Sequence, residues 1–331
     1  VCIAAYFLIV REQNNKSASA QIFAMDTYME LTAYGKNAEE AVGAAKDEIE
    51  RLDALLSTGN EKSEIGQLNK NKKGQISADT QYLLNRSFTI YEETDGTFDI
   101  TIYPVMRAWG FTGEEHRIPS EEELQSLLQL VDASSLQYDA STQTLTLPEG
   151  VEIDFGGIAK GYTSQRVAQI MQEYDINSAI LNLGGNVQLV GAKPDGSSWK
   201  VAIKSPDEQE EYLGVLSAQN KAIITSGGYE RYFEENGRKY HHIIDPKTGI
   251  PAYNGLQSVT IVSEDGTLAD GLSTALYVMG TESAVKFWQN HSDEFDAILY
   301  TDDGNLYVTE GIADTFTSSH SITVLEKAVA F

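Results

Sequence analysis

The sequence predicts an α+β fold in two intimately packed lobes, with largely antiparallel sheets and flanking helices. Helical spacing of apolar residues in some segments alternates with short runs of strand-like residues in others. Adjacent strands are joined by short turns such as Asn236-Gly237, which favours antiparallel hairpins. A chain of 331 residues can bury one large core or form two lobes, and no internal repeat divides it further.

The elements are expected in the following order. Residues 21–34 alternate well enough for a strand or a hairpin. Helices follow at 38–56, 79–93 and 120–131, the last of which begins at the start signal Pro119-Ser120. From Leu145 onward short strands dominate, interrupted by helices at 158–174 and 268–289. The pairs Gly184-Gly185 and Gly227-Gly228 are expected to be tight turns near the cleft between the lobes.

Residues 1–20 are expected to be the remnant of a signal or anchor segment with a linker, and residues 21–331 to be the folded domain. Val1 to Val10 is apolar, but ten residues are too few to span a bilayer. A buried strand is the alternative. Cys2 suggests a lipoprotein, although the apolar residues after it are unlike a mature lipoprotein's polar start. The pattern favours export, and it leaves the anchor open between lipid, transmembrane segment and cleaved signal.

Charge and cysteine content exclude several classes of function. The 24 lysines and arginines against 49 aspartates and glutamates give a net charge of −25, which disfavours nucleic acid or an anionic membrane surface as a partner. The single cysteine excludes internal disulfides and cysteine-based zinc sites.

Residues 152–163, Glu-Ile-Asp-Phe-Gly-Gly-Ile-Ala-Lys-Gly-Tyr-Thr, are typical of a strand that enters a double glycine and then a helix. Gly156 and Gly157 allow the backbone to approach a ligand, and the N–H groups of a helix that begins at Ile158 favour an anion. Lys160 lies in the first helical turn, where a cation is unfavourable without a negative partner. A plain turn with a solvated lysine is the alternative.

Residues 267–280 predict a second helix, with Thr267 as its N-cap. Asp270 and Thr274 are four residues apart and share one face of that helix. A carboxylate and a hydroxyl are hard oxygen ligands suited to Mg²⁺. The alternative is a capping box, in which Thr267 and Asp270 only stabilise the helix start.

Residues 240–249, Tyr-His-His-Ile-Ile-Asp-Pro-Lys-Thr-Gly, predict a strand that ends in a turn. Neighbouring strand residues face opposite sides, so only one of His241 and His242 can point at a given site. Histidine is the side chain best able to exchange a proton near neutral pH. A structural histidine is the alternative.

These segments together with Asp95-Gly96-Thr97-Phe98-Asp99 resemble the ApbE family of FAD:protein FMN transferases. The resemblance runs in order from Ala24-Met25-Asp26-Thr27 through Leu56-Ser57-Thr58 to the helix at 267–280, and so spans nearly the whole chain after the first twenty residues. It implies an ApbE-like fold and an enzyme that, with Mg²⁺, moves the FMN half of FAD onto a threonine or serine hydroxyl of another protein and releases AMP.

The resemblance also implies roles for individual residues. Those that fall where FAD is held are Met25, Thr97, Phe98, Asp99, Asp154, Lys160 and Ile244. The metal falls to the Gly157 carbonyl and to the side chains of Asp270 and Thr274. His242 matches the family's histidine and is the candidate general base, with Asp245 either orienting it or capping the turn. Gly59 departs from the family, which often has an aromatic residue there, and a glycine cannot stack on a flavin or adenine ring at the FAD site.

Three functions remain open from the sequence. The first is the transferase, the second an Mg²⁺-dependent FAD pyrophosphatase giving FMN and AMP, and the third a non-catalytic FAD-binding protein. The metal ligands favour an enzyme over the third. The family implies that the acceptors are exported or membrane redox proteins carrying an acceptor threonine or serine, and that the chain is extracytoplasmic and attached to the cell membrane.

Overall fold

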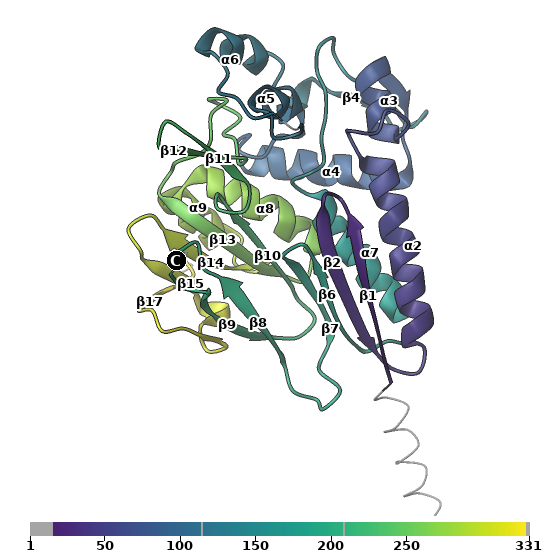
Figure 1. The fold of residues 1–331 in the computed structure, drawn as a ribbon, viewed down its shortest axis with the longest axis vertical. Helices are drawn as coiled ribbons and strands as arrows, with labels where there is room; N and C mark the ends of the chain where they lie inside the picture. Colours follow the sequence, from purple (N-terminus) through teal and green to yellow (C-terminus); the bar gives the residue numbers. More distant parts are fainter. Residues whose placement is uncertain (1–15, 114, 208, 329–331) are drawn as a thin grey trace, which may run out of the picture.

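The computed structural model describes residues 16–113, 115–207 and 209–328, and a nine-stranded sheet forms its centre (Figure 1). Every neighbouring pair of strands is antiparallel except β15 and β17, so the predicted antiparallel pairing is confirmed. In sheet order the strands are β1 Ser17–Ala24, β2 Thr27–Tyr34, β6 Ser178–Leu183, β7 Asn186–Gly191, β10 Ala222–Gly227, β13 Leu256–Ser263, β14 Asp296–Thr301, β15 Leu306–Thr309 and β17 Ile322–Leu325.

The two faces of this sheet bury different cores, because strand side chains alternate between faces. In β14, Ala297 and Leu299 belong to the core under the helices, whereas Ile298 and Tyr300 belong to the opposite core. The helices on this face of the sheet are α2 Ala38–Leu56, α7 Ala159–Glu173, α8 Gly266–Met279 and α9 Thr281–Asn290. The opposite face packs against a three-stranded sheet of β8 Trp199–Lys204, β9 Tyr212–Ala218 and β16 Phe316–Thr317, and α10 Glu310–Ala313 lies beside β15.

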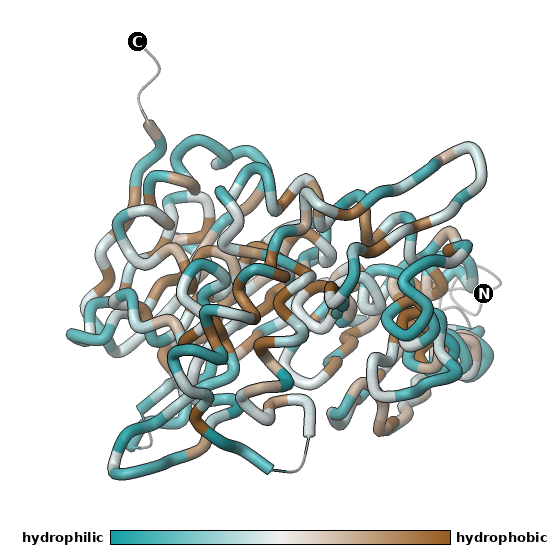
Figure 2. The backbone as a smooth tube through the Cα atoms, turned by 90° about the horizontal axis from the view of Figure 1, so that it is seen from above, coloured by the Kyte–Doolittle hydropathy of each residue, from teal (hydrophilic) through white to brown (hydrophobic). Residues whose placement is uncertain are grey.

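A second lobe is formed by the chain between α2 and α7 and lies above the sheet in Figure 1. One continuous core contains Leu84 and Ile90 of this lobe with Leu272 and Leu276 of α8, so the two lobes are closely packed, as predicted. In Figure 2 the apolar segments gather in the interior of the molecule. The elements of this lobe are α3 Glu64–Asn71, β3 Lys73–Gln75, α4 Ala78–Glu93, η1 Ile100–Ile102, α5 Tyr103–Trp109, α6 Glu121–Leu128, η2 Ala133–Ser135, β4 Gln137–Asp139 and β5 Thr144–Thr146.

Several predicted boundaries are wrong. Strand β1 begins at Ser17 rather than at residue 21, and residues 151–155, which include the predicted strand before Gly156, belong to no strand. The helix predicted at 268–289 is two helices, α8 and α9, which Gly280 separates. Gly280 has φ of +79°, and a Cβ there would lie 2.4 Å from the Asn254 carbonyl oxygen, so the chain turns at a position where only glycine fits.

The predicted cap of α8 is also wrong. Asp265 is the N-cap, and its Oδ1 accepts a hydrogen bond of 2.9 Å from the backbone N–H of Leu268. The hydroxyl of Thr267 instead donates to the side-chain oxygen of Gln165 at 2.7 Å. Because Asp265 performs the capping, the carboxylate of Asp270 is not needed for it.

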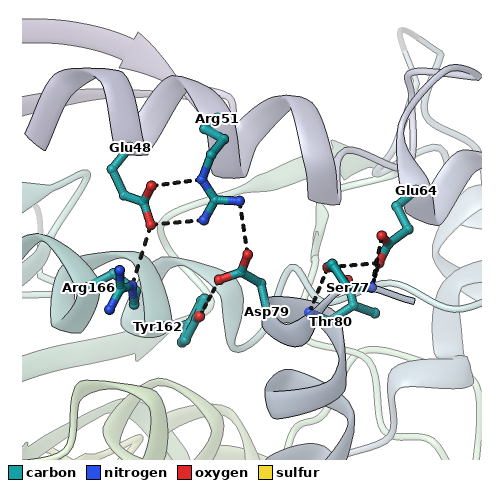
Figure 3. A network of polar contacts seen from close by, with 8 residues as sticks. All are labelled: Glu48, Arg51, Glu64, Ser77, Asp79, Thr80, Tyr162 and Arg166. Carbon is teal, nitrogen blue, oxygen red and sulfur yellow. Dashed lines mark hydrogen bonds and ion pairs between the residues drawn. The ribbon is translucent and has the colours of Figure 1, made fainter. Parts of the chain in front are cut away.

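A network of polar contacts joins α2, α4 and α7 (Figure 3). Arg51 donates to Glu48 at 2.7 Å and to Asp79 at 2.9 Å, and the hydroxyl of Tyr162 donates to the other oxygen of Asp79 at 2.5 Å. Arg166 reaches Glu48 from α7 at 3.4 Å. The network therefore fixes the helix whose first turn carries Lys160.

Residues 1–15 of the predicted signal or anchor segment and linker, including Cys2, lie outside the described residues, whereas residues 17–20 belong to strand β1 and not to a linker. Among residues 16–113, 115–207 and 209–328, no helix has both the length and the hydropathy needed to cross a membrane.

Candidate active site

Helices α7 and α8 approach each other unusually closely at Gly161. A Cβ on this residue would lie 2.2 Å from the Gly266 carbonyl oxygen and 2.5 Å from the Asp270 Cβ, so the contact requires glycine. The close approach lets the backbone N–H of Gly161 donate to Asp270 Oδ2 at 2.7 Å. The glycine after Lys160 therefore places the first turn of α7 directly against the carboxylate of α8.

Asp270 is a buried carboxylate with an exposed fraction of 5%. Besides the Gly161 N–H, it accepts the side-chain N–H of Asn186 at 3.0 Å on Oδ1. It makes no ion pair in the described part of the chain. Burial raises the pKa of Asp270, and the positive charge of Lys160 and these two hydrogen bonds oppose the rise. A buried carboxylate with hydrogen bonds but no direct ion pair among the described residues fits a site that receives a cation.

The other two predicted metal ligands lie on the same segments. Thr274 is one turn after Asp270 on α8, and its hydroxyl lies 3.2 Å from Ser226 Oγ at the end of β10. Gly157 precedes α7, and a Cβ there would lie 3.0 Å from the Phe98 ring. Within the described residues no cluster of three or more histidines, cysteines, aspartates or glutamates could hold a metal. The three predicted ligands offer one carboxylate, one hydroxyl and one carbonyl, a set that would suit a cation that retains water ligands.

The hairpin of β11 Tyr232–Glu235 and β12 Arg238–His241 positions His242. Its register pairs Tyr232 with His241, and therefore Arg231 and His242 are opposite each other just beyond the strands. The His242 backbone N–H donates to the Arg231 carbonyl at 3.1 Å. His242 Nδ1 lies 3.2 Å from the same oxygen, and because a carbonyl only accepts, Nδ1 carries the hydrogen. Nε2 then keeps a lone pair that can accept a proton.

His242 is half-buried and held neutral. Burial, and then the positive charge of Arg231, lower the pKa of His242 to about 3; Lys160 lowers it further. Two cations therefore act on this imidazole, one from the hairpin and one from the first turn of α7. Asp245 does not orient it, because Asp245 Oδ1 accepts the Lys247 backbone N–H at 2.9 Å and caps the turn.

His241 faces the other side of the hairpin, as strand alternation predicts. Its Nε2 donates to the Ala252 carbonyl at 3.0 Å, and its ring contacts Tyr253 and Tyr277 edge-on. Nδ1 is buried and has no hydrogen-bond partner among the described residues. His241 is 5% exposed and belongs to the interior.

We expect His241 to make stability depend on pH. Burial lowers its pKa to about 4, against 6.5 for an ordinary histidine. Between pH 6.5 and 4 the unfolded chain takes up a proton that the folded chain does not, so the free energy of unfolding falls as pH falls through this window. His241→Gln keeps the donor to Ala252 and should remove on the order of 1 to 3 kcal/mol of that loss in urea titrations at pH 7 and pH 4. An unchanged difference between the two pH values would contradict this.

The turn between β1 and β2 brings Met25 and Asp26 to the site. Both residues have positive φ, 49° and 58°, as a two-residue hairpin turn requires. The Met25 N–H donates to Asp53 Oδ1 at 3.0 Å, and Met25 Sδ lies 3.7 Å from the Thr163 hydroxyl of α7. Asp154 accepts the Gly156 N–H at 2.9 Å; burial raises the pKa of Asp154, Arg231 opposes this, and Asp26 adds to it.

The remaining predicted FAD residues differ in what their side chains can reach. Thr97 is half-buried and its hydroxyl donates to the Thr94 carbonyl at 3.1 Å, whereas Phe98 packs over Gly157. The Asp99 carboxylate accepts hydrogen bonds from Thr101 N–H at 2.8 Å, from the Thr101 hydroxyl at 2.6 Å and from Ala133 N–H at 3.1 Å. Both oxygens of the Asp99 carboxylate therefore already accept hydrogen bonds from the chain itself.

The side chains at Ile244 and Gly59 offer little to the predicted binding of FAD. The Ile244 side chain is buried in a cluster with Val105 and Trp109, so only its backbone is available to a ligand. Gly59 is exposed, and only Ser57 Oγ, at 4.0 Å, lies near a Cβ built there. The described structure records no contact between Gly59 and the other predicted site residues, although an aromatic side chain would have space at this position.

Arg231 is the residue that sequence reasoning missed. The signal was present in the hairpin: if Asn236-Gly237 forms a two-residue turn, Glu235 pairs with Arg238, and the register then places Arg231 opposite His242. Opposite residues of an antiparallel pair share a face. The prediction of the turn and the prediction of the histidine therefore together point to Arg231.

Comparison with known proteins gives a consistent result. Residues 25–299 match the ApbE family. The FAD:protein FMN transferases of Haemophilus influenzae and Vibrio cholerae are 30% and 32% identical to this chain, over 83% and 77% of it and 82% and 78% of their own lengths. Two solved structures are similar. The ApbE protein of Thermotoga maritima has a TM-score of 0.84 and is 31% identical, and the match covers 89% of this chain and 98% of that one. The flavin transferase ApbE of Vibrio cholerae has a TM-score of 0.81 and is 26% identical, and the match covers 91% of this chain and 99% of that one.

Proposed function

We infer that this chain, which belongs to the ApbE family, is a FAD:protein FMN transferase: an enzyme that moves FMN from FAD onto a protein acceptor, a post-translational flavinylation. The inference rests on four groups that act on one another: the neutral His242 and the cation Arg231 from the β11–β12 hairpin, the cation Lys160 from α7 and the buried Asp270 carboxylate from α8. The acceptor is a threonine or serine hydroxyl, the bond formed is a phosphoester, and AMP leaves.

The chain's own residues supply three parts of this reaction. Lys160 attracts the pyrophosphate of FAD, which a chain of charge −25 otherwise repels. Nε2 of His242 accepts the proton of the attacking hydroxyl. Met25, Phe98 and Asp154 line the places where the family holds FAD, with Asp154 in a binding role.

Mg²⁺ is proposed as the cofactor, held by Asp270, Thr274 and the Gly157 carbonyl. The burial of this carboxylate, which makes no direct ion pair with any residue that the structure describes, supports this assignment. When bound, the ion would neutralise charge on the pyrophosphate. Asn186 and the Gly161 N–H hold the carboxylate in place by their hydrogen bonds, and it would be a ligand of the ion.

The acceptors are proposed to be exported or membrane redox proteins, and the chain is proposed to act outside the cytoplasm, attached to the membrane through its N-terminus. The resemblance to the family and the apolar residues 1–10 support these proposals.

Intact mass spectrometry tests the function. With FAD, Mg²⁺ and an acceptor, we expect AMP and an acceptor heavier by one FMN phosphoester unit, and no product when the acceptor threonine is changed to alanine. Without acceptor, hydrolysis should be slow, because proximity accelerates only the group that the site holds. If FMN and AMP are the only products with every acceptor tested, the chain is a pyrophosphatase.

A further inference from the structure

We propose that Arg231 is a further catalytic residue, whose guanidinium contacts the phosphoryl group being transferred and stabilises the negative charge that develops on it. The proposal rests on the proposed function, because only cleavage of the FAD pyrophosphate brings a phosphorus beside His242.

The position of Arg231 follows from the hairpin register. Arg231 and His242 are opposite each other, joined by the hydrogen bond from the His242 N–H to the Arg231 carbonyl at 3.1 Å. Opposite residues of an antiparallel pair have Cβ atoms about 5 Å apart on the same face. The next pair on this face, Phe233 and Tyr240, stacks at 5.3 Å and packs against Trp109, so the hairpin is anchored. A hydroxyl within reach of His242 therefore has the Arg231 side chain as a neighbour.

The guanidinium is held in place but not neutralised. Its Nη2 donates to the Phe111 carbonyl at 2.6 Å, and it forms no ion pair with any carboxylate that the structure describes. The residue is exposed, so its remaining N–H donors are open to a ligand. Its charge reaches the site, since it lowers the pKa of both His242 and Asp154. A planar guanidinium matches phosphate oxygens with two parallel hydrogen bonds, which an ammonium cannot do.

The proposed reaction gives Arg231 a role different from that of Lys160, which attracts the pyrophosphate of FAD. The acceptor oxygen forms a bond to the FMN phosphorus, its proton passes to Nε2 of His242, and the bond from that phosphorus to the AMP phosphate breaks, with the electron pair leaving on AMP. Charge is spread over the oxygens of the transferred phosphoryl group at this stage. A donor already fixed beside the attacking hydroxyl stabilises that charge without reorganisation.

The test uses Arg231→Ala and Arg231→Lys, with Arg238→Gln as the matched control. Arg238 is on the same hairpin but lies at its turn, over Tyr240 and Tyr253. Transfer from saturating FAD to a threonine acceptor, with Mg²⁺, is followed by intact mass in single turnover. We expect the rate to fall about 10²-fold in Arg231→Ala and about 10-fold in Arg231→Lys, with FAD binding changed far less. Arg238→Gln should stay within about 2-fold of wild type.

Added guanidinium ion at low millimolar concentration should restore part of the rate of Arg231→Ala and leave the wild-type rate unchanged, which a purely structural role would not produce. Thermal unfolding of each variant identifies any loss of fold, and Arg231→Lys keeps the test valid if the alanine variant unfolds. If the wild type transfers FMN, three results would overturn this proposal alone. They are an Arg231→Lys variant as active as the wild type, a folded Arg231→Ala variant as active as the wild type, and a folded Arg231→Ala variant that guanidinium does not rescue. Absence of transfer by the wild type overturns the proposed function as well.

Discussion

His242→Ala is expected to lower the rate of FMN transfer by about 10²- to 10⁴-fold while leaving FAD binding nearly unchanged. The reason is the loss of Nε2, which the hydrogen bond from Nδ1 to the Arg231 carbonyl keeps unprotonated and available. Single-turnover rates at saturating FAD measure the chemical step, and flavin fluorescence titrations measure binding. A loss confined to FAD affinity would contradict a role as general base.

His241→Gln is the matched control for this experiment. It changes the neighbouring histidine on the opposite face, and glutamine can still donate to the Ala252 carbonyl. We expect its transfer rate to stay within a few-fold of wild type. An equal loss in both variants would mean that the hairpin as a whole, rather than one imidazole, determines the rate.

The pH profile gives a second check on His242. A general base acts when it is deprotonated, so activity is lost as pH falls through its pKa. In the free enzyme that pKa is about 3, because the imidazole is buried and beside Arg231 and Lys160. The two negative charges of the FAD pyrophosphate offset these cations and should raise the pKa in the complex. The acid limb of kcat should therefore lie at higher pH than the acid limb of kcat/KM.

The local elements could be predicted from the sequence where one pattern dominated. The helix 38–56 has the same bounds in the structure, and the Asn236-Gly237 turn joins β11 and β12 as expected. The pattern was misleading where tertiary contacts decide. Apolar residues continue through Gly280, but its positive φ and its closeness to Asn254 break the helix. Threonine is a residue type that often caps helices, but the Thr267 hydroxyl donates to the side-chain oxygen of Gln165 from α7 instead.

The candidate site shows the same division. The order of the motifs predicted its candidate members, and in the structure the charge of Lys160 acts on both the Asp270 carboxylate and the His242 imidazole. What the sequence could not predict was how each side chain is used. Asp99 accepts from Ala133 as well as from the neighbouring Thr101, and Ile244 is buried with Val105 and Trp109. The contacts with Ala133, Val105 and Trp109 come from segments distant in the chain. The closeness of α7 to α8 depends on Gly161 having no side chain, which spacing alone does not reveal.

Asp270→Asn is expected to abolish the response of the enzyme to limiting Mg²⁺ and to lower the transfer rate there by 10²-fold or more. The substitution removes the negative charge from a buried position that is hydrogen-bonded by Gly161 and Asn186 but makes no direct ion pair within the described chain. A neutral amide attracts a divalent cation far less, and one of these donors loses its acceptor. AMP release against Mg²⁺ concentration measures the effect.

Asp265→Asn is the control that separates a metal ligand from a helix cap. Asp265 is the actual N-cap of α8, one turn before Asp270, and it also pairs with Arg86 at 2.9 Å. Asparagine caps a helix about as well as aspartate, so this variant removes the same charge from the same helix without removing the predicted ligand. Its Mg²⁺ response should match the wild type. If Asp270→Asn also keeps wild-type turnover at limiting Mg²⁺, the carboxylate is structural. The Lys160 ammonium, rather than a metal, then offsets the cost of its burial.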